Sequence, residues 1–344
     1  MSSSPPASAP PPAGEPTPAP LRRIRFDWRI LPVFAVTGGV MFVLVRKLAG
    51  PEAFFAALAN ADWNLLALAL VLLAINLALA AKRWIVVLAA LGYRVPMKRA
   101  LEAMLATWPL ALITPARASD VLRGVAIRDF APAFVGAGSV LAERAIDLQS
   151  LCLMTIVGAG LAGVPSVVVL AIAMLLFEWT VILLIVRKSV FITRMPLLRR
   201  RPEKVEQVLL AFGALLQRPK LLLYAAVLSL GSWGAAIAML QTLLWMTHAQ
   251  VDPTVTFALW PAAVLAGMVP ITLAGMGTRD GAFVYLLRVT GYTPILEGSL
   301  LASTFGYAVL GTLLFALAGI PFTVRFVLRV SRGEAPRPPD APGA

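Results

Sequence analysis

Long apolar runs separated by short polar stretches make up most of the chain. Four of these runs approach or exceed the ~20 residues that cross a bilayer as a helix. They are ILPVFAVTGGVMFVLV, NLLALALVLLAINLALA, VPSVVVLAIAMLLFEWTVILLIV and LLLYAAVLSLGSWGAAIAMLQTLLWM. None shows the polar face that a surface helix of a soluble protein presents at helical spacing. The pattern predicts an all-α polytopic membrane protein and argues against a soluble helical bundle.

The same pattern sets the expected order of elements. A short interfacial helix is expected over residues 51–63, after the first span. Full spans are expected at about 30–48, 64–82 (continuing as a helix to 91), 132–162, 165–186, 221–247 and 295–324.

Two apolar segments are interrupted by helix-breaking residues. LEAMLATWPLALI ends at Thr114-Pro115, and PITLAGMGTRDGAF contains Pro270, Gly275 and Gly277. Proline cannot donate a backbone hydrogen bond, and glycine adopts conformations closed to other residues. If both segments are re-entrant, six spans remain and the two halves form an inverted repeat, as in many transporters. If both segments cross, there are eight spans.

Charge and composition place the chain in a membrane. The formal net charge is +13, yet only 14% of residues are charged and 59% are hydrophobic. The basic residues gather in loops and at span ends, as the positive-inside rule requires for cytoplasmic segments. We therefore expect a multi-pass protein of the plasma (inner) membrane with both termini in the cytoplasm, and no nucleic-acid partner.

The chain divides into one membrane domain and two tails. Residues 1–20 and 333–344 are rich in proline and are expected to be disordered. The membrane domain is expected over 21–332. It comprises a first half, a cytoplasmic basic loop and a second half, at 30–186, 187–220 and 221–332.

Several chemistries are disfavoured by what the chain contains. It has one cysteine and one histidine, which excludes an internal disulfide and disfavours a metal site or a Ser-His-Asp triad. It has no GxxxxGK[ST] nucleotide-binding motif. We expect no metal and no cofactor.

The first constellation of charged residues follows the first break, in TPARASDVLRG. Asp120 and Arg123 are spaced to pair on one helix face. Arg117 lies nearby, after Pro115. A helix that begins near Ser119 would offer free backbone N–H groups, so the segment could cradle a phosphate. An ordinary cytoplasmic loop with solvated charges is the alternative.

The second constellation is the adjacent pair Arg279–Asp280, which follows the glycines of the second break. An unsatisfied backbone in lipid is costly, so such a break must be buried in protein or line a wet cavity. The alternative is a simple turn that places Arg279 and Asp280 at the lipid headgroups.

The third constellation is LAERAIDLQSL, inside an apolar run. Glu143, Arg144 and Asp147 carry a net charge of −1 and would attract a cation such as Arg117 or Arg123. Charged residues within a span usually face the bundle interior. A structural clamp that pins the first broken segment and a functional relay are both consistent with this pattern.

Four stretches in this order resemble the lysylphosphatidylglycerol synthase transmembrane region, also called the flippase-like family. They are KRWIVVLAALGYRVPMKRAL, TPARASDVLRG, LAERAIDL and VPITLAGMGTRDGAF. Asp120 and Asp280 stand where the family usually has Glu, Ser119 stands where it has Gly, and Tyr307 lies in a stretch where it often has an arginine. The resemblance implies a stand-alone member that moves lipids between leaflets and lacks the aminoacyl-transfer domain.

Together these observations predict a lipid translocase more than an enzyme. Arg117, Arg123 and Arg279 are the expected ligands of an anionic or polyisoprenoid lipid phosphate. The expected orienting or relay carboxylates are Asp120, Glu143, Asp147 and Asp280, with Arg144 in an ion pair. The alternatives are a membrane-embedded lipid-modifying transferase and a non-catalytic scaffold for a neighbouring lipid-synthesis enzyme.

Overall fold

The computed structural model describes residues 31–187, 202–269, 272, 275–292 and 297–331. Side chains are described for these residues except for those of 31–34, 113, 115–118 and 202–208. The expected disordered tails lie outside the described residues, as does Pro270.

The described residues form helices joined by turns and short extended segments and contain no strand, which confirms the expected all-α polytopic membrane fold. Four helices are long and apolar enough to cross a bilayer: α3 (Leu65–Ala90), α7 (Pro165–Val186), α10 (Pro219–Met246) and the continuous stretch Glu297–Ser331. The other two expected spans are also helical. They are α1 (Leu31–Leu44) with a π-helical extension η2 (Val45–Ala49), and α6 (Ala133–Leu161).

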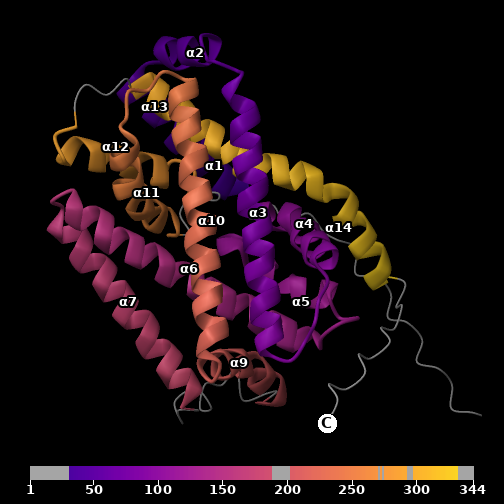
Figure 1. Ribbon diagram of the computed structural model, residues 1–344. Coiled ribbons are helices and arrows are strands. Elements are labelled where there is room, and N and C mark those ends of the chain that lie inside the picture. Colours follow the sequence, from indigo (N-terminus) through magenta and orange to yellow (C-terminus); the bar gives the residue numbers. More distant parts are fainter. Residues whose placement is uncertain (1–30, 188–201, 270–271, 273–274, 293–296, 332–344) are drawn as a thin grey trace, which may run out of the picture.

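Helices α3 and α10 form the central pair of the molecule (Figure 1). The side-chain amide nitrogen of Asn76 on α3 donates hydrogen bonds to the backbone carbonyl and the hydroxyl of Ser232 on α10, at 2.7 and 3.0 Å. Polar contacts of this kind hold transmembrane helices together where lipid offers no hydrophobic driving force. Helix α2 (Pro51–Ala59) crosses one end of this pair, and α9 (Pro202–Leu216) crosses the other.

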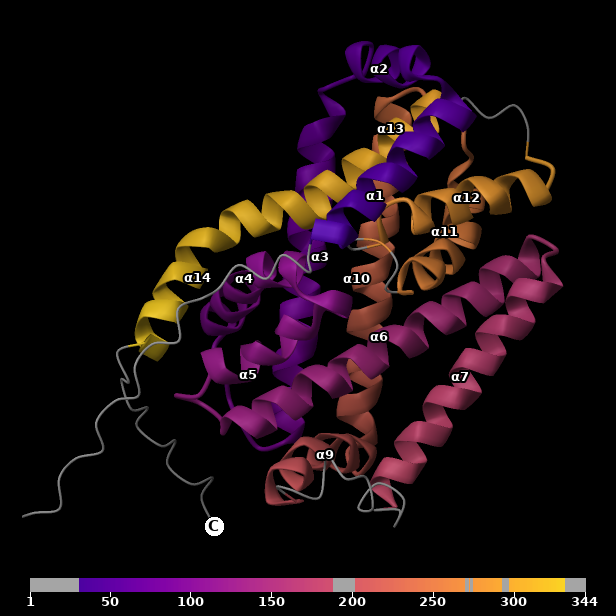
Figure 2. The ribbon, with the colours of Figure 1, turned by 180° about the vertical axis from the view of Figure 1, so that it is seen from behind.

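The two broken segments start from opposite ends of the molecule. The amide of Asp62 after α2 donates to the carbonyl of Met246 at the end of α10, so the second segment begins at the α2 end. Arg218 before α10 donates to the carbonyl of Ala89 near the end of α3, so the first segment begins at the α9 end. Accordingly, α12 (Thr278–Val289) lies toward α2 and α5 (Arg123–Ala126) toward α9 (Figure 2).

The broken segments pack closely because glycines remove side chains at the contacts. Helix α11 (Pro253–Gly267) crosses α6 at Gly158, where an added Cβ would lie 2.3 Å from the carbonyl oxygen of Ala258. Helix α4 (Met97–Ile113) meets the last helix at Gly319, where a Cβ would lie 2.3 Å from the carbonyl oxygen of Leu105. Each of the two segments is therefore fastened to a helix of the surrounding bundle.

The last helical stretch is longer than its predicted span of 295–324. It runs as α13 (Glu297–Ala308), a π-helical η5 (Val309–Leu314) and α14 (Phe315–Ser331). A helix of 35 residues is about 50 Å long at the α-helical rise. That exceeds the ~30 Å hydrocarbon core, so the stretch must tilt or leave the bilayer. Its α14 portion bends away from the bundle and packs along α4 (Figure 1).

Helix α9 lies in the segment that we expected to be only a basic loop. It packs against α6 and places Ala211 and Leu215 in a buried cluster with α3 and α10. The α9 part of the segment 187–220 therefore contributes to the core of the membrane domain. Residues 188–201, which contain much of its positive charge, lie outside the described part.

Candidate functional site

The first backbone break follows α4. Thr114 adopts an extended conformation, and a 3₁₀ helix, η3 (Pro115–Leu122), leads into the four-residue α5. The amide of Ser119 donates to the hydroxyl of Thr114 at 3.2 Å. One of the two hypotheses for this segment was a helix that begins near Ser119 with free N–H groups. The structure instead has 3₁₀ geometry through this position, and the Ser119 N–H already has an acceptor.

Arg123, which begins α5, joins this break to α6. Its guanidinium lies 3.0 Å from the carboxylate of Glu143 and 3.4 Å from that of Asp120. Arg123 is 1% exposed and also lies 5.8 Å from the ring of Trp84. Arg123 is thus one of the two cations that the excess negative charge of the LAERAIDLQSL segment was expected to attract. The side chain of the other, Arg117, lies outside the described residues.

Arg83 of α3 completes the same network, although it is not among the site residues proposed from the sequence. Its guanidinium donates to both oxygens of Asp147, at 2.5 and 2.9 Å, and to Glu143 at 2.8 Å. It is 3% exposed. The sequence offered one signal: Arg83 precedes Trp84 within the apolar continuation of the second span. Because the apolar helix continues to Ala90, Arg83 lies within the helix and not at its end.

The sixth charged residue is Arg144, which pairs with Asp120 and lies 3.8 Å from Asp147. We call these residues the six-charge cluster: Arg83, Asp120, Arg123, Glu143, Arg144 and Asp147. Three arginines face three carboxylates, so the cluster is neutral. The side chain of Arg144 is 39% exposed, whereas the other five are almost fully buried.

Neutral side chains hold the carboxylates of the cluster in place. Asp147 accepts hydrogen bonds from the hydroxyl of Ser229 at 2.9 Å and from the indole of Trp233 at 3.1 Å, both on α10. Buried charges are tolerated when they are paired and hydrogen-bonded in this way. The cluster therefore ties α3, α5, α6 and α10 together.

The second backbone break separates α11 from α12. Gly275 and Gly277 have φ of +75° and +91°, a region that side chains disfavour. A Cβ on Gly275 would lie 2.7 Å from the carbonyl oxygen of Gly267, and one on Gly277 would lie 2.5 Å from Val40 of α1. The glycines are therefore required both by conformation and by the closeness of α1 and α11.

The Arg279–Asp280 pair lies inside the protein at the start of α12. Asp280 is fully buried: one oxygen accepts from the amide of Gly277 at 2.9 Å, and the other accepts from Arg279 at 3.0 and 3.1 Å. The guanidinium of Arg279 lies 5.1 Å from the ring of Trp260 and 4.8 Å from that of Tyr307. A simple turn at the lipid headgroups, the alternative interpretation, would leave both side chains exposed. Here Arg279 and Asp280 are buried within the protein.

The two groups of charges are separate. Within the described residues, no ion pair or hydrogen bond joins Arg279 or Asp280 to the six-charge cluster. Each group is neutral and sits beside one of the two opposed breaks. This aromatic pair was not identified from the sequence, because Trp260 carries no local signal and Tyr307 was noted only as a departure from a family motif.

One further carboxylate is enclosed without a partner. Glu178 of α7 is 7% exposed, and neither of its carboxylate oxygens has a hydrogen-bond partner in the described structure. The described residues also contain no group of three or more His, Cys, Asp or Glu side chains placed to hold a metal ion.

Residues 30–319 match the family described as the lysylphosphatidylglycerol synthase TM region. The chain belongs to this family. A search of curated proteins finds no match to the chain. The family membership and the apolar helices together make the protein a multi-pass integral membrane protein of the flippase-like kind.

The region that matches the lysylphosphatidylglycerol synthase TM family includes both breaks and the six-charge cluster. The Arg-Trp stretch that resembles the family places Arg83 in the cluster and Trp84 against Arg123. In the last helix, Tyr307 presents its ring to Arg279, and the face of an aromatic ring attracts a guanidinium.

Proposed function

We propose that this protein moves an anionic phospholipid or polyisoprenoid phosphate between the leaflets of the plasma membrane. The proposal is supported above all by the buried Arg279–Asp280 pair beside the second backbone break. Ionised groups are expensive inside a membrane protein and mark ligand or ion pathways. Backbone breaks in transporters commonly surround the site that binds the substrate.

Arg279 is the best candidate to hold the lipid phosphate. Among the residues that the structure describes, it has a single carboxylate partner and two aromatic faces, whereas Arg123 is shared between Glu143 and Asp120. A guanidinium can bind a phosphate through two parallel hydrogen bonds. Asp280 keeps the site neutral when it is empty, and a phosphate would compete with it for the same donors.

The six-charge cluster has a supporting role in this proposal. It is neutral, and five of its six side chains are enclosed, so a phosphate entering it would have to displace a carboxylate. Its exposed member, Arg144, lies beside Asp120 at the first break. We assign it the task of fixing the first broken segment against α3, α6 and α10, the clamp interpretation of the sequence.

Leaflet exchange in reconstituted vesicles tests this function. The full-length protein is placed in vesicles that contain tail-labelled fluorescent phosphatidylglycerol, and loss of fluorescence to an impermeant reductant is followed. Arg279→Gln should slow exchange at least about tenfold, the loss expected when one charge-assisted hydrogen bond is removed. Arg288→Gln is the matched control, because Arg288 lies on the same helix with its side chain 51% exposed.

A second variant guards against misfolding. Arg279→Gln leaves Asp280 buried without its cation, so Arg279→Gln with Asp280→Asn removes both charges and restores neutrality. It should fold like the native protein in a thermal unfolding measurement and still be slow in exchange. Native exchange rates in this folded double variant would overturn the proposal.

A further inference from the structure

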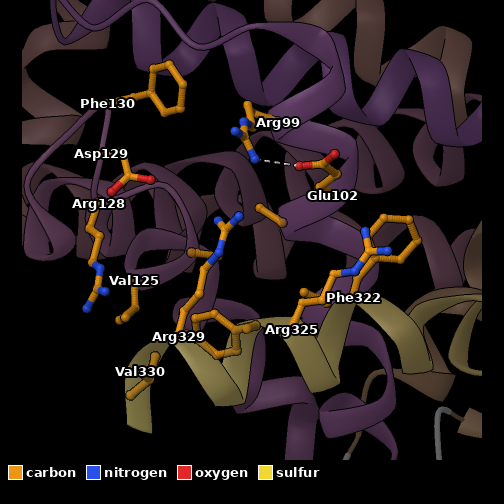
Figure 3. Close-up of a pocket in the computed structure, with 14 residues that line it drawn as sticks. Arg99, Glu102, Val125, Arg128, Asp129, Phe130, Phe322, Arg325, Arg329 and Val330 are labelled. Atoms are coloured by element: carbon orange, nitrogen blue, oxygen red, sulfur yellow. Dashed lines mark hydrogen bonds and ion pairs between the residues drawn. The ribbon is translucent and has the colours of Figure 1, made fainter. Parts of the chain in front are cut away.

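A cavity of about 560 Å³ lies between the start of α4, the segment after α5 and the end of α14 (Figure 3). It is on the side of the molecule away from α2 and from α12, the helix that begins with Arg279 and Asp280. Its volume falls within the roughly 300–1,000 Å³ range of small-ligand sites. The charged residues that line it are Arg99, Glu102, Arg128, Asp129, Arg325 and Arg329. Four arginines and two carboxylates leave a net charge of +2.

The positive charge of the cavity comes mainly from α14. Arg99 and Glu102 neutralise each other across 3.0 Å. Arg325 and Arg329 lie one turn apart on α14, and neither has an ion-pair partner among the described residues. Figure 3 shows Arg329 extending from α14 into the space that Arg99 and Glu102 face. Like charges at this spacing repel, and an anion between them would relieve that repulsion.

The cavity combines this charge with apolar surface. Phe130 and Phe322 line it, and Val324 and Leu328 on α14 are 51% and 46% exposed. Basic residues at the end of a span normally lie on an open surface, where they contact water and whichever anionic headgroups are nearby. Here they line a concave site bordered by phenylalanines, with exposed aliphatic side chains alongside. A ligand that fits has a phosphate at one end and acyl chains at the other.

We propose that this cavity binds the phosphate headgroup of an anionic phospholipid from the cytoplasmic leaflet. Arg325 and Arg329 donate to the phosphate, and the acyl chains lie along the exposed face of α14. This site is distinct from Arg279 and requires only that lipid binds, not that it is moved. If the leaflet-exchange test fails, the binding proposal can still be correct. If the binding test fails, the proposed exchange function can still be correct.

The test measures equilibrium binding to the full-length protein in a neutral detergent. The probe is short-chain phosphatidylglycerol, with phosphatidylcholine of the same chain length and inorganic phosphate as separate arms. Arg325→Gln with Arg329→Gln should weaken phosphatidylglycerol binding at least about tenfold. The control is Arg94→Gln with Lys98→Gln, which removes the same charge from exposed positions that do not line the cavity. It should leave affinity within about twofold.

The three arms separate the possible ligands. Phosphatidylcholine and inorganic phosphate should each bind more weakly than phosphatidylglycerol, because the first has no net charge and the second has no acyl chains. Equal losses in the two double variants would mean general charge attraction and would overturn the proposal. So would unchanged binding in the α14 variant, or inorganic phosphate that binds as tightly as the lipid. All four substituted side chains are exposed, so folding should be unaffected.

Discussion

At the scale of single residues, the buried charges of the six-charge cluster and of the Arg279–Asp280 pair are stable because each has a partner at short range. Arg83 is the clearest case: it bridges Asp147 and Glu143, and the hydroxyl of Ser229 accepts a further hydrogen bond from it at 3.1 Å. Two carboxylates on successive turns of α6 would repel each other without it. Arg83 is therefore needed to bury them.

Replacing Arg83 with glutamine should destabilise the protein strongly. The change leaves Glu143 and Asp147 with less positive charge in a buried setting, a defect that typically costs about 3–5 kcal/mol. Thermal unfolding of the detergent-solubilised protein measures the loss. Adding Asp147→Asn should recover part of it, since the second change removes the carboxylate that was left uncompensated.

The matched control is Arg99→Gln. Arg99 also pairs with a carboxylate, Glu102, but its side chain is 44% exposed. Exposed pairs contribute about 0–1 kcal/mol. If Arg83→Gln were no more damaging than Arg99→Gln, the six-charge cluster would not stabilise the fold.

At the scale of elements, close helix contacts depend on individual glycines. Gly158 and Gly160 lie two residues apart on α6 and face different surroundings. A Cβ on Gly158 would lie 2.3 Å from the carbonyl oxygen of Ala258, whereas one on Gly160 would meet only Val168, at 4.0 Å. The first glycine sets the distance between α6 and α11, and the second does not.

Alanine at these two positions should have opposite effects. Gly158→Ala forces α11 away from α6 and should cost about 1–3 kcal/mol, as overpacking does. Gly160→Ala adds a better helix former without a clash and should be neutral or stabilising by up to about 1 kcal/mol. The melting temperatures of the two variants test this prediction, and that of Gly158→Ala should be the lower. Equal melting temperatures would show that the α6–α11 contact is looser than described.

At the scale of the whole molecule, the two ends of the α3–α10 pair carry different elements, α2 at one end and α9 at the other. Helix α3 has 26 residues and so spans about 39 Å, enough to cross the hydrocarbon core. Residues beside α2 and beside α9 should therefore lie on opposite sides of the membrane. The excess of basic residues predicts that the α9 side is cytoplasmic.

Single-cysteine labelling tests this orientation. Cys152 is fully buried and is the only native cysteine, so a Cys152→Ala protein is a clean background. Asn60→Cys, at the end of α2, should react with an impermeant maleimide in intact cells. Gln217→Cys, after α9, should react only after permeabilisation, and both positions are exposed. Labelling of both from the same side would contradict the predicted topology.

The sequence by itself determined the class of protein and most of its helices. Apolar runs, helix breakers and glycines are local signals, and each acts on the few residues around it. For this reason the ranges 64–91, 165–186 and 221–247 closely match α3, α7 and α10. Proline and glycine within apolar segments also located both breaks. The local 3₁₀ geometry after Thr114 was not predicted, because it depends on a hydroxyl that accepts from Ser119.

Only the tertiary structure decided which charges meet. Arg83 and Asp147 are 64 positions apart, and no local pattern relates them. The same holds for Arg279 with Trp260 and Tyr307, and for the arginines of α14 that share a cavity with α4. A buried charge needs a partner of opposite sign, so the sequence shows that partners must exist. Which residues they are depends on how the helices pack.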